Sequence, residues 1–352
     1  MGSESTSIVN SSDDIAVKLW EGRKLLYKDV LKQSRLGSMV SSSGTNVVHL
    51  KSMNASEAGD VITFPIRFNN NTNFLPENAK IEDNLDKMHF GSFKLTLTSG
   101  NLGISGGTDI SKARNPYDEN TELRAAAVDA GANALSNAMI AELLNTSQTS
   151  AYLYFAGSDT LQKGTVKATC RDLITGNDLV TPERLSKAKS WAIANRVNDR
   201  VVIEPILWNG NYIYPTFISQ NVINDLKQDT TYFAAIQNAL PRDSNNPIFT
   251  GAVGLWDGLL LLPDDRLVDY EVDNSSNIRT SDVIICGKQA LCYGIKGMPE
   301  ILIRAVDAFD EQYAAGYKSI YGLKKPMFSK NGVSHTFGSV NVLFATSNTV
   351  NA

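Results

Sequence analysis

Two segments in the first third of the chain alternate apolar and polar residues with a period of two. The first lies in residues 62–68 and the second in residues 93–98. Such alternation predicts β-strands with one apolar face. The apolar positions are Ile62, Phe64, Ile66 and Phe68 in the first strand, and Phe93, Leu95 and Leu97 in the second. Pro65 cannot donate a ladder hydrogen bond, so we expect the first strand at a sheet edge.

The residues between these strands are polar and rich in asparagine, as in NNNTNF at 69–74. Hairpin loops usually contain ~2–5 residues, and this connection is several times longer. A two-stranded ribbon is also barely stable alone in water. We therefore expect the ribbon, if ordered, to lie on another surface, such as that of a neighbouring subunit.

A long helical pattern covers residues 118–146. Pro116 interrupts the preceding structure, and Asp118 or Asn120 is suited to cap the helix. The expected length of about 25 residues is twice the average. One stripe of the helix carries mostly small side chains, namely Leu123, Ala127, Ala130, Ala134, Ala138 and Ala141. This stripe is equally consistent with a long straight supporting helix and with an ordinary core helix.

The N-terminal region has two parts. Residues 1–12 are rich in serine and weakly apolar, so we expect them to be disordered. Residues 13–37 place apolar side chains at helical spacing, with Asp13 as a plausible cap and Gly37 as a plausible stop. The combination predicts an arm that packs either on its own body or on a neighbour.

The rest of the chain mixes short strands and short helices, which predicts an α+β fold. We expect helices over residues 181–196, with Thr181 as the cap, over 221–240, with Asn221 as the cap, and over 288–294. Residues 299–316 fit either structure. We expect strands over residues 152–157, 200–208, 212–219, 282–287 and 331–346.

Composition and charge narrow the function classes. The chain has 352 residues, of which 42% are hydrophobic and 20% charged, as in ordinary globular proteins. Its formal net charge of −4 gives no basic field for tight nucleic-acid binding, although this charge is compatible with weak contact with DNA. The first residues lack the apolar core of a secretory signal, and no stretch approaches the ~18 apolar residues of a membrane span.

Cysteine and histidine residues give no metal or redox motif. Cys170, Cys286 and Cys292 form no CxxC pair, which favours buried thiols in a reducing environment. His49, His89 and His335 are far apart in the sequence, so the HExxH pattern of a zinc site is absent. We expect no metal and no cofactor.

The search for enzymatic motifs yields one weak candidate. The sequence contains no GxGxxG after a strand, no P-loop and no GxSxG elbow. Asp264 and Asp265 in the PDDR stretch are adjacent carboxylates, which elsewhere bind Mg²⁺ or act in acid–base chemistry. Adjacent side chains point apart, so a solvated turn is favoured over a carboxylate-dependent hydrolase.

The most specific stretch of the sequence is NALPRDSNNPIFTGAVGLWDGLLLLPDD at 238–265. It resembles a segment of the major capsid proteins of the N-four-like tailed bacteriophages. Residues 59–68, 118–146 and 286–294 resemble further parts of those proteins, in the same order. The motif that carries the resemblance consists of Asn246, Pro247, Ile248, Phe249, Thr250, Gly251, Ala252, Gly254, Trp256, Asp257 and Gly258.

The resemblance implies the HK-97-type major capsid fold. Its expected parts are an N-terminal arm over residues 1–45, an extended loop with peripheral-domain strands over 46–115 and a spine helix over 116–150. A mainly axial domain is expected over 151–300, and residues 301–352 should return to the peripheral domain. The extended loop is expected to contact a neighbouring subunit through Phe64, Ile66, Phe68, Phe74, Phe93 and Leu95.

The same resemblance implies a structural function. The chain is expected to form hexameric and pentameric capsomers of an icosahedral head shell that encloses the phage genome, assembled in the bacterial cytoplasm. Portal, scaffold or decoration proteins are its expected partners, with weak non-specific contact with packaged double-stranded DNA. The alternative is another head protein, such as a decoration or head-completion adaptor. A hydrolase using Asp264 and Asp265 is a distant third.

Two residue-level hypotheses accompany this interpretation. Gly251, Gly254 and Gly258 are expected to set turns and close approaches, while Trp256 and the leucines at 259–262 fill a core. The fold's namesake joins its subunits by a lysine–asparagine bond, and we can assign no matching pair here. We therefore expect noncovalent assembly.

Overall fold

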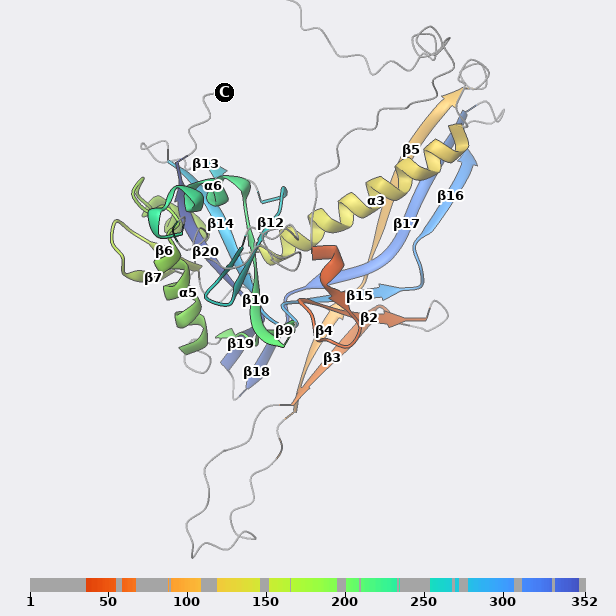
Figure 1. Cartoon of the computed structure of the whole chain (residues 1–352). Coiled ribbons are helices and arrows are strands. Elements are labelled where there is room, and N and C mark those ends of the chain that lie inside the picture. The colour runs from red at the N-terminus through yellow and green to blue at the C-terminus, as the bar shows by residue number, and fades with distance from the viewer. Residues whose placement is uncertain are drawn as a thin grey trace, which may run out of the picture.

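A computed structural model gives the fold of the chain (Figure 1). Two large sheets organise it, a nine-stranded sheet in a compact body and a six-stranded sheet in an elongated limb. The structure describes residues 36–54, 59–67, 88, 90–108, 119–145, 152–164, 166–194, 201–208, 210–232, 234, 254–267, 270–271, 278–306, 312–330 and 333–347. The expected arm helix lies almost entirely outside these residues, as do Phe68 and Phe74.

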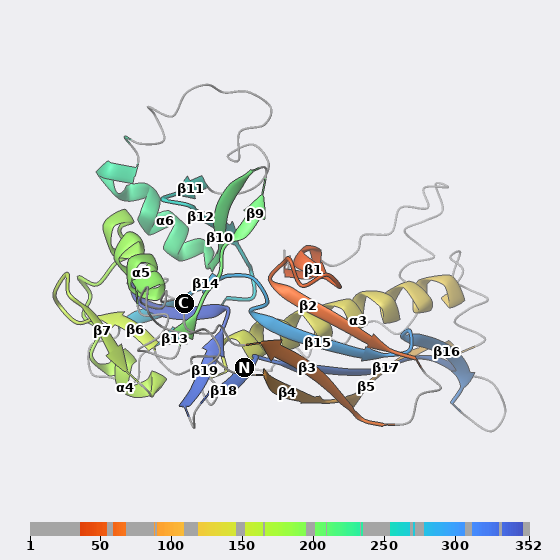
Figure 2. The same ribbon diagram turned by 90° about the horizontal axis from the view of Figure 1, so that it is seen from below.

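The body sheet has the strand order β11-β12-β10-β14-β20-β6-β7, with β9 paired to β10 and β13 paired to β14. Helices α4 (Lys167–Asp172), α5 (Pro182–Ala194) and α6 (Gln220–Gln228) belong to the same lobe (Figure 2). The strands are β6 (Tyr152–Phe155), β7 (Leu161–Gly164), β9 (Ile206–Trp208), β10 (Asn211–Ile218), β11 (Gly254–Trp256), β12 (Leu259–Pro263), β13 (Tyr270–Glu271), β14 (Arg279–Cys286) and β20 (Ser339–Thr346).

Both faces of the body sheet are covered. Along β14, Val283 and Ile285 pack in one apolar cluster with α5 and α6. Ile284 and Cys286 point to the other face and pack in a second cluster with the limb. Every residue of β14 after Arg279 is buried, and the second half of the strand, residues 283–286, is accordingly a continuous apolar run and not an alternation.

The limb sheet has the order β1-β2-β15-β17-β16, and β5 pairs with the second edge of β17. A short 3₁₀ helix, η1 (Leu36–Met39), precedes it. The strands are β1 (Val40–Ser41), β2 (Val48–Met53), β5 (Thr98–Thr108), β15 (Leu291–Lys296), β16 (Glu300–Ala305) and β17 (Gln312–Lys324).

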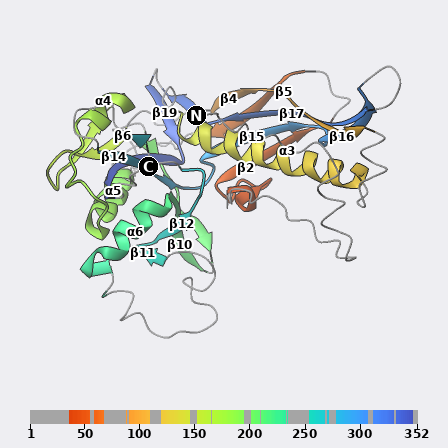
Figure 3. The same ribbon diagram turned by 90° about the horizontal axis from the view of Figure 1, so that it is seen from above.

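One long helix, α3 (Glu119–Leu143), runs along the limb beside β5 and β17 (Figure 3). It confirms the helix predicted over residues 118–146. Its approach to the sheet is close at Gly131, where an added Cβ would lie 2.6 Å from Tyr317 Cε2. On the sheet, Ile104 and Ala315 contribute to the cluster that faces α3. The helix therefore covers one face of the limb.

The two strands predicted from alternation form an antiparallel hairpin, β3 (Val61–Arg67) with β4 (Phe90–Thr96). Their apolar face packs on the limb sheet, on the side opposite α3. The hairpin approaches the sheet closely at Gly294 and Gly322, which we call the seat glycines. A Cβ on Gly294 would lie 2.8 Å from Ile62 Cδ1, and one on Gly322 would lie 2.6 Å from Thr96 O. Pro65 is tolerated because β3 pairs only with β4 in the described residues.

A small third sheet closes the junction between body and limb. Its order is β18-β19-β8, with bounds Met327–Lys330, Val333–Phe337 and Val201–Val202. The single strand expected over 331–346 is two strands, β19 and β20, separated by Gly338 at φ 79°. The positive φ requires the glycine and redirects the chain into the body sheet.

Two other expectations were wrong in detail. Residues 288–294 form a turn and then β15, not a helix, because Leu291 and Tyr293 are buried between β2 and β17. Helix α6 starts from Ser219, whose hydroxyl accepts a hydrogen bond from Val222 N, and not from Asn221. It ends at Gln228, where the side chain of Asp229 accepts bonds from two following amides.

Helix α5 begins as predicted, with Thr181 Oγ1 accepting from Arg184 N at 3.3 Å. The sheets cross the segment boundaries expected from the sequence. Strand β15, within the segment 151–300, lies in the limb sheet, and β20, within 301–352, lies in the body sheet.

Candidate assembly surfaces

The described part of the specific motif forms the β11–β12 hairpin. Asp257 and Gly258 are its two turn residues, with φ values of 45° and 74° that match the left-handed turn of a tight hairpin. The Asp257 carboxylate pairs with Lys189 of α5 at 3.0 Å. The remaining motif residues lie outside the described residues, namely Asn246, Pro247, Ile248, Phe249, Thr250, Gly251 and Ala252.

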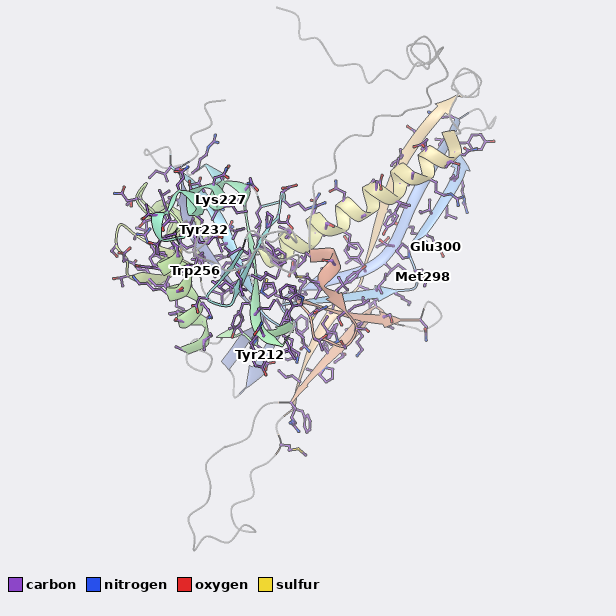
Figure 4. The ribbon with its side chains drawn as sticks, viewed as in Figure 1. Tyr212, Lys227, Tyr232, Trp256, Met298 and Glu300 are labelled. Atoms are coloured by element: carbon purple, nitrogen blue, oxygen red, sulfur yellow. The ribbon has the colours of Figure 1, made fainter. Side chains whose placement is uncertain are left out.

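Trp256 fastens this hairpin to α5. Its indole Nε1 donates to Pro182 O at 3.0 Å and to Ser186 Oγ at 3.1 Å. The ring is partly buried and lies 6.0 Å from the ring of Tyr232, centroid to centroid (Figure 4). A Cβ on Gly254 would lie 2.8 Å from the Tyr232 hydroxyl, so the strand approaches closely there. The described part of the motif, residues 254–258, thus packs within the body.

The two adjacent carboxylates after β12 do not share a site. Asp264 is buried and its Oδ1 accepts from Arg266 N at 3.0 Å, whereas Asp265 is exposed. The Arg266 side chain reaches α3, where it donates to Asn137 Oδ1 at 2.9 Å and Asn133 Oδ1 at 2.8 Å. This turn ties the body to the long helix, and nothing in its geometry favours hydrolysis.

Charged side chains are buried where body and limb meet. Asp282 of β14 pairs with Lys167 at 2.5 Å and Arg171 at 3.5 Å, both from α4. Lys325 is 0% exposed, and burial lowers the pKa of its amine to about 8, against the opposing effect of Glu142 and Asp282. These residues are far apart in the sequence and form no local motif, so no sequence pattern predicts the cluster.

No group of three or more potential metal ligands occurs among the described residues. His49 packs edge-on against Phe64, and burial lowers its pKa. The three cysteines are free and buried, and burial raises the pKa of Cys286 and of Cys292 to about 12. None of the described helices is long and apolar enough to cross a membrane.

The hairpin residues expected to contact a neighbour lie largely within the chain's own core. Phe64, Phe93 and Leu95 are buried against the limb, and Ile66 packs at the edge of the same cluster. Buried side chains are inaccessible to a second subunit, so we correct this assignment for Phe64, Phe93 and Leu95. The exposed apolar side chains of this region are Met88 and Phe90, at the outer end of the stem.

In the described part of the chain, no element covers one face of the far half of the limb sheet, which we call the open limb face. Ile301 and Ile303 of β16 pack toward α3, so the alternating residues Leu302 and Arg304 point away from it and are exposed. Glu300, Leu302, Arg304, Gly103, Gly316 and Lys318 make up this face. The β3–β4 hairpin covers the same face of the sheet, but only in the half of the limb that is nearer the body.

A second exposed apolar group lies on the body. Leu207 and Tyr212 are directly paired across the β9–β10 hairpin and are exposed, with Trp208 beside them (Figure 4). An exposed apolar group of this kind is typical of an interaction surface. The chain therefore presents uncovered apolar side chains on both lobes.

A protein-family model described as phage capsid protein matches residues 8–343. The chain belongs to the phage capsid protein family. A curated relative, the major capsid protein of Pseudomonas phage KPP25, is 26% identical over 146 residues. That match covers 39% of this chain and 39% of the relative, so the chain spans about two fifths of the relative's length.

Solved phage capsid structures resemble nearly the whole length of this chain. The capsid of Ralstonia phage GP4 has a TM-score of 0.72 at 16% identity, covering 94% of this chain and 96% of that one. The Cyanophage Pam1 capsid has a TM-score of 0.76 at 17% identity, covering 93% and 96%. The capsid of Helicobacter pylori bacteriophage KHP30 has a TM-score of 0.69 at 12% identity, covering 98% and 100%.

These likenesses confirm the α+β phage capsid fold of the HK-97 type that the sequence resemblance implied. The family itself is confirmed by the family model that matches residues 8–343, whereas membership of the N-four-like subgroup stays a prediction.

Proposed function

We propose that this chain is a major capsid protein that assembles into the icosahedral head shell of a tailed phage. The main support is the uncovered apolar surface of a thin limb, which carries a long helix on one face and an open sheet on the other. A monomeric protein gains nothing from a projecting two-layer limb, whereas a neighbour in a lattice supplies the missing layer.

The parts of the fold have corresponding roles in this proposal. The limb sheet with α3 is the peripheral domain, and α3 is its spine helix. The nine-stranded body is the axial domain, whose loops meet around the capsomer axis. The loop beyond β3 and β4 extends to a neighbour, and the N-terminal residues form an arm.

The proposed partners follow from the shell. Copies of this chain form hexamers and pentamers without covalent links, and portal, scaffold or decoration proteins complete the head. Contact with packaged DNA is weak and independent of sequence, because the chain carries a formal net charge of −4. Assembly takes place in the cytoplasm of the host bacterium.

Purified chain tests the proposal by size-exclusion chromatography and negative-stain electron microscopy over a range of protein concentrations. We expect capsomers or closed shells, with the assembled fraction rising with concentration. Small rings that never close would favour a decoration or head-completion protein. A chain that stays monomeric at every concentration, with and without a co-expressed scaffold, would refute a shell.

A further inference from the structure

Basic side chains surround the seat glycines on the face of the limb sheet that the β3–β4 hairpin covers. In the sheet register, Cys292 of β15 is paired with His49 on one side and with Lys324 on the other, and Lys51 is paired with the seat glycine Gly294. Alternation along each strand places these side chains on one face. We call the group the basic ring, and its members are His49, Lys51, Lys296 and Lys324.

Two lysines of the basic ring hold the hairpin by its backbone. Lys51 Nζ donates to Thr63 O at 2.7 Å, and Lys296 Nζ donates to Gly59 O at 3.1 Å. Neither strand of the hairpin contains Asp or Glu. Among the described residues, none of the four basic side chains pairs with a carboxylate. The hairpin therefore docks on positive charge without supplying negative charge.

The same basic side chains contact the aromatic rings of the hairpin. The ring of His49 lies 5.2 Å from that of Phe64, centroid to centroid, with 75° between their planes. Lys51 Nζ lies 5.7 Å from the centroid of the same ring, and Lys324 Nζ lies 5.5 Å from that of Phe93. Because an ammonium group already lies over Phe64, a positive charge on His49 would compete with it for one aromatic face.

The surroundings of His49 oppose its protonation. Burial and then the charge of Lys51 lower the pKa of His49 below its ordinary value of 6.5. Across the sheet, burial raises the pKa of Cys292 to about 12, so its thiol stays neutral, and Lys324 beyond it is a further cation. Ser41 of β1 and the aromatic ring of β3 do not titrate. The docked hairpin thus favours a neutral imidazole, and this contribution to docking is lost as the pH falls below 6.5.

We propose that the basic ring is an acid-sensitive switch, in which protonation of His49 releases the β3–β4 hairpin from the limb sheet. The imidazolium would be a fourth cation beside three lysines, with no carboxylate on the hairpin strands to offset it, whereas release of the hairpin exposes it to water. At neutral pH His49 is uncharged and the hairpin stays docked. The switch goes beyond the proposed shell, because it operates in a single chain and needs no second copy.

Thiol labelling at Cys292 tests the switch. This side chain is 2% exposed in the cluster that contains Phe64 and Phe93, so its labelling reports release of the hairpin. The unassembled full-length chain is treated with a dipyridyl disulfide at pH 7.5 and at pH 5, where each thiol forms a mixed disulfide and displaces one thiopyridone. We expect labelling of Cys292 relative to Cys286 to rise severalfold at pH 5. The rise is at most about 30-fold, because His49 in the released state has its ordinary pKa of 6.5.

Two substitutions bracket the charge of His49. His49→Phe is neutral at every pH and should abolish the rise, while His49→Arg is positive at every pH and should give high labelling of Cys292 already at pH 7.5. Ser52→His in the His49→Phe chain is the matched control, since Ser52 is exposed on the same strand, and its labelling should stay independent of pH. If His49→Arg does not fold, Cys286 is labelled as well, and the His49→Phe comparison decides alone.

The outcomes separate the switch from the proposed function. Equal labelling of wild-type Cys292 at both pH values, or an unchanged rise in His49→Phe, would overturn the switch. A parallel rise at Cys170 and Cys286 would show acid unfolding of the whole chain and would overturn it as well. Failure of the wild-type chain to form capsomers would count against the shell and leave the switch standing, because labelling is measured on the unassembled chain.

Discussion

The body and the limb bury their sheets differently. All residues of β20 and nearly all of β14 are buried, because helices cover one face and the limb covers the other. In the limb, β16 alternates between partly buried and exposed residues, because among the described elements α3 alone covers it. Substitutions in the body should therefore change the stability of the single chain, and substitutions on the open limb face should change assembly.

The largest expected effect is in the body core. Phe344 is 0% exposed and stacks on Phe155 with 5.7 Å between ring centroids. Phe344→Ala should lower the free energy of unfolding by ~3–5 kcal/mol, through lost transfer energy and the cavity that remains. Urea unfolding of the unassembled chain measures it. A loss below 1 kcal/mol would contradict a tightly packed body.

The next effect concerns the junction. The pKa of Lys325 is about 8 in the folded chain against an ordinary 10.5, so the unfolded chain binds more protons between these pH values. The free energy of unfolding should therefore rise with pH across that window, by up to ~3 kcal/mol from this group. Lys325→Met should remove that part of the rise in urea titrations at pH 7.5–10.5. An unchanged slope would show an amine that keeps its ordinary pKa.

A smaller effect is expected at the β11–β12 hairpin. Trp256→Phe removes the indole donor to Pro182 O and Ser186 Oγ while keeping most of the ring. The cost should be ~1–3 kcal/mol, because a partly buried carbonyl loses its hydrogen-bond partner. Urea unfolding measures it, with Trp208→Phe on the exposed hairpin as the control. Equal effects of the two substitutions would contradict a fastening role for Trp256.

The smallest expected effect on the single chain is at the limb. Leu302, 43% exposed on the open limb face, is a surface position. Leu302→Ser should change the free energy of unfolding by no more than ~0.5 kcal/mol while lowering the yield of shells. Comparing urea midpoints with particle counts decides this. A variant that unfolds more easily yet assembles normally would reverse the contrast between the lobes.

Elements covered on one face were predicted from the sequence more accurately than strands buried on both faces. Alternation located β3 and β4 because their hairpin has one covered face, and capping chemistry at Thr181 located the start of α5. The helix expected over 288–294 was wrong, because the apolar residues 290–293 are buried on both faces of the sheet and such a run has no period that distinguishes a strand from a helix. Lys167 and Asp282 are 115 positions apart, so no local pattern could reveal their pairing.

The two seat glycines also set the direction in which the hairpin points. Atoms of β3 and β4 touch the sheet where Gly294 and Gly322 lack side chains, whereas Arg67 and Phe90 lie at the far end of the strands. A methyl group added at either glycine would push the near end of the hairpin away from the sheet. The resulting tilt of the strands would displace their far end by a larger distance. The close packing at these two glycines thus sets the direction of the β3–β4 stem.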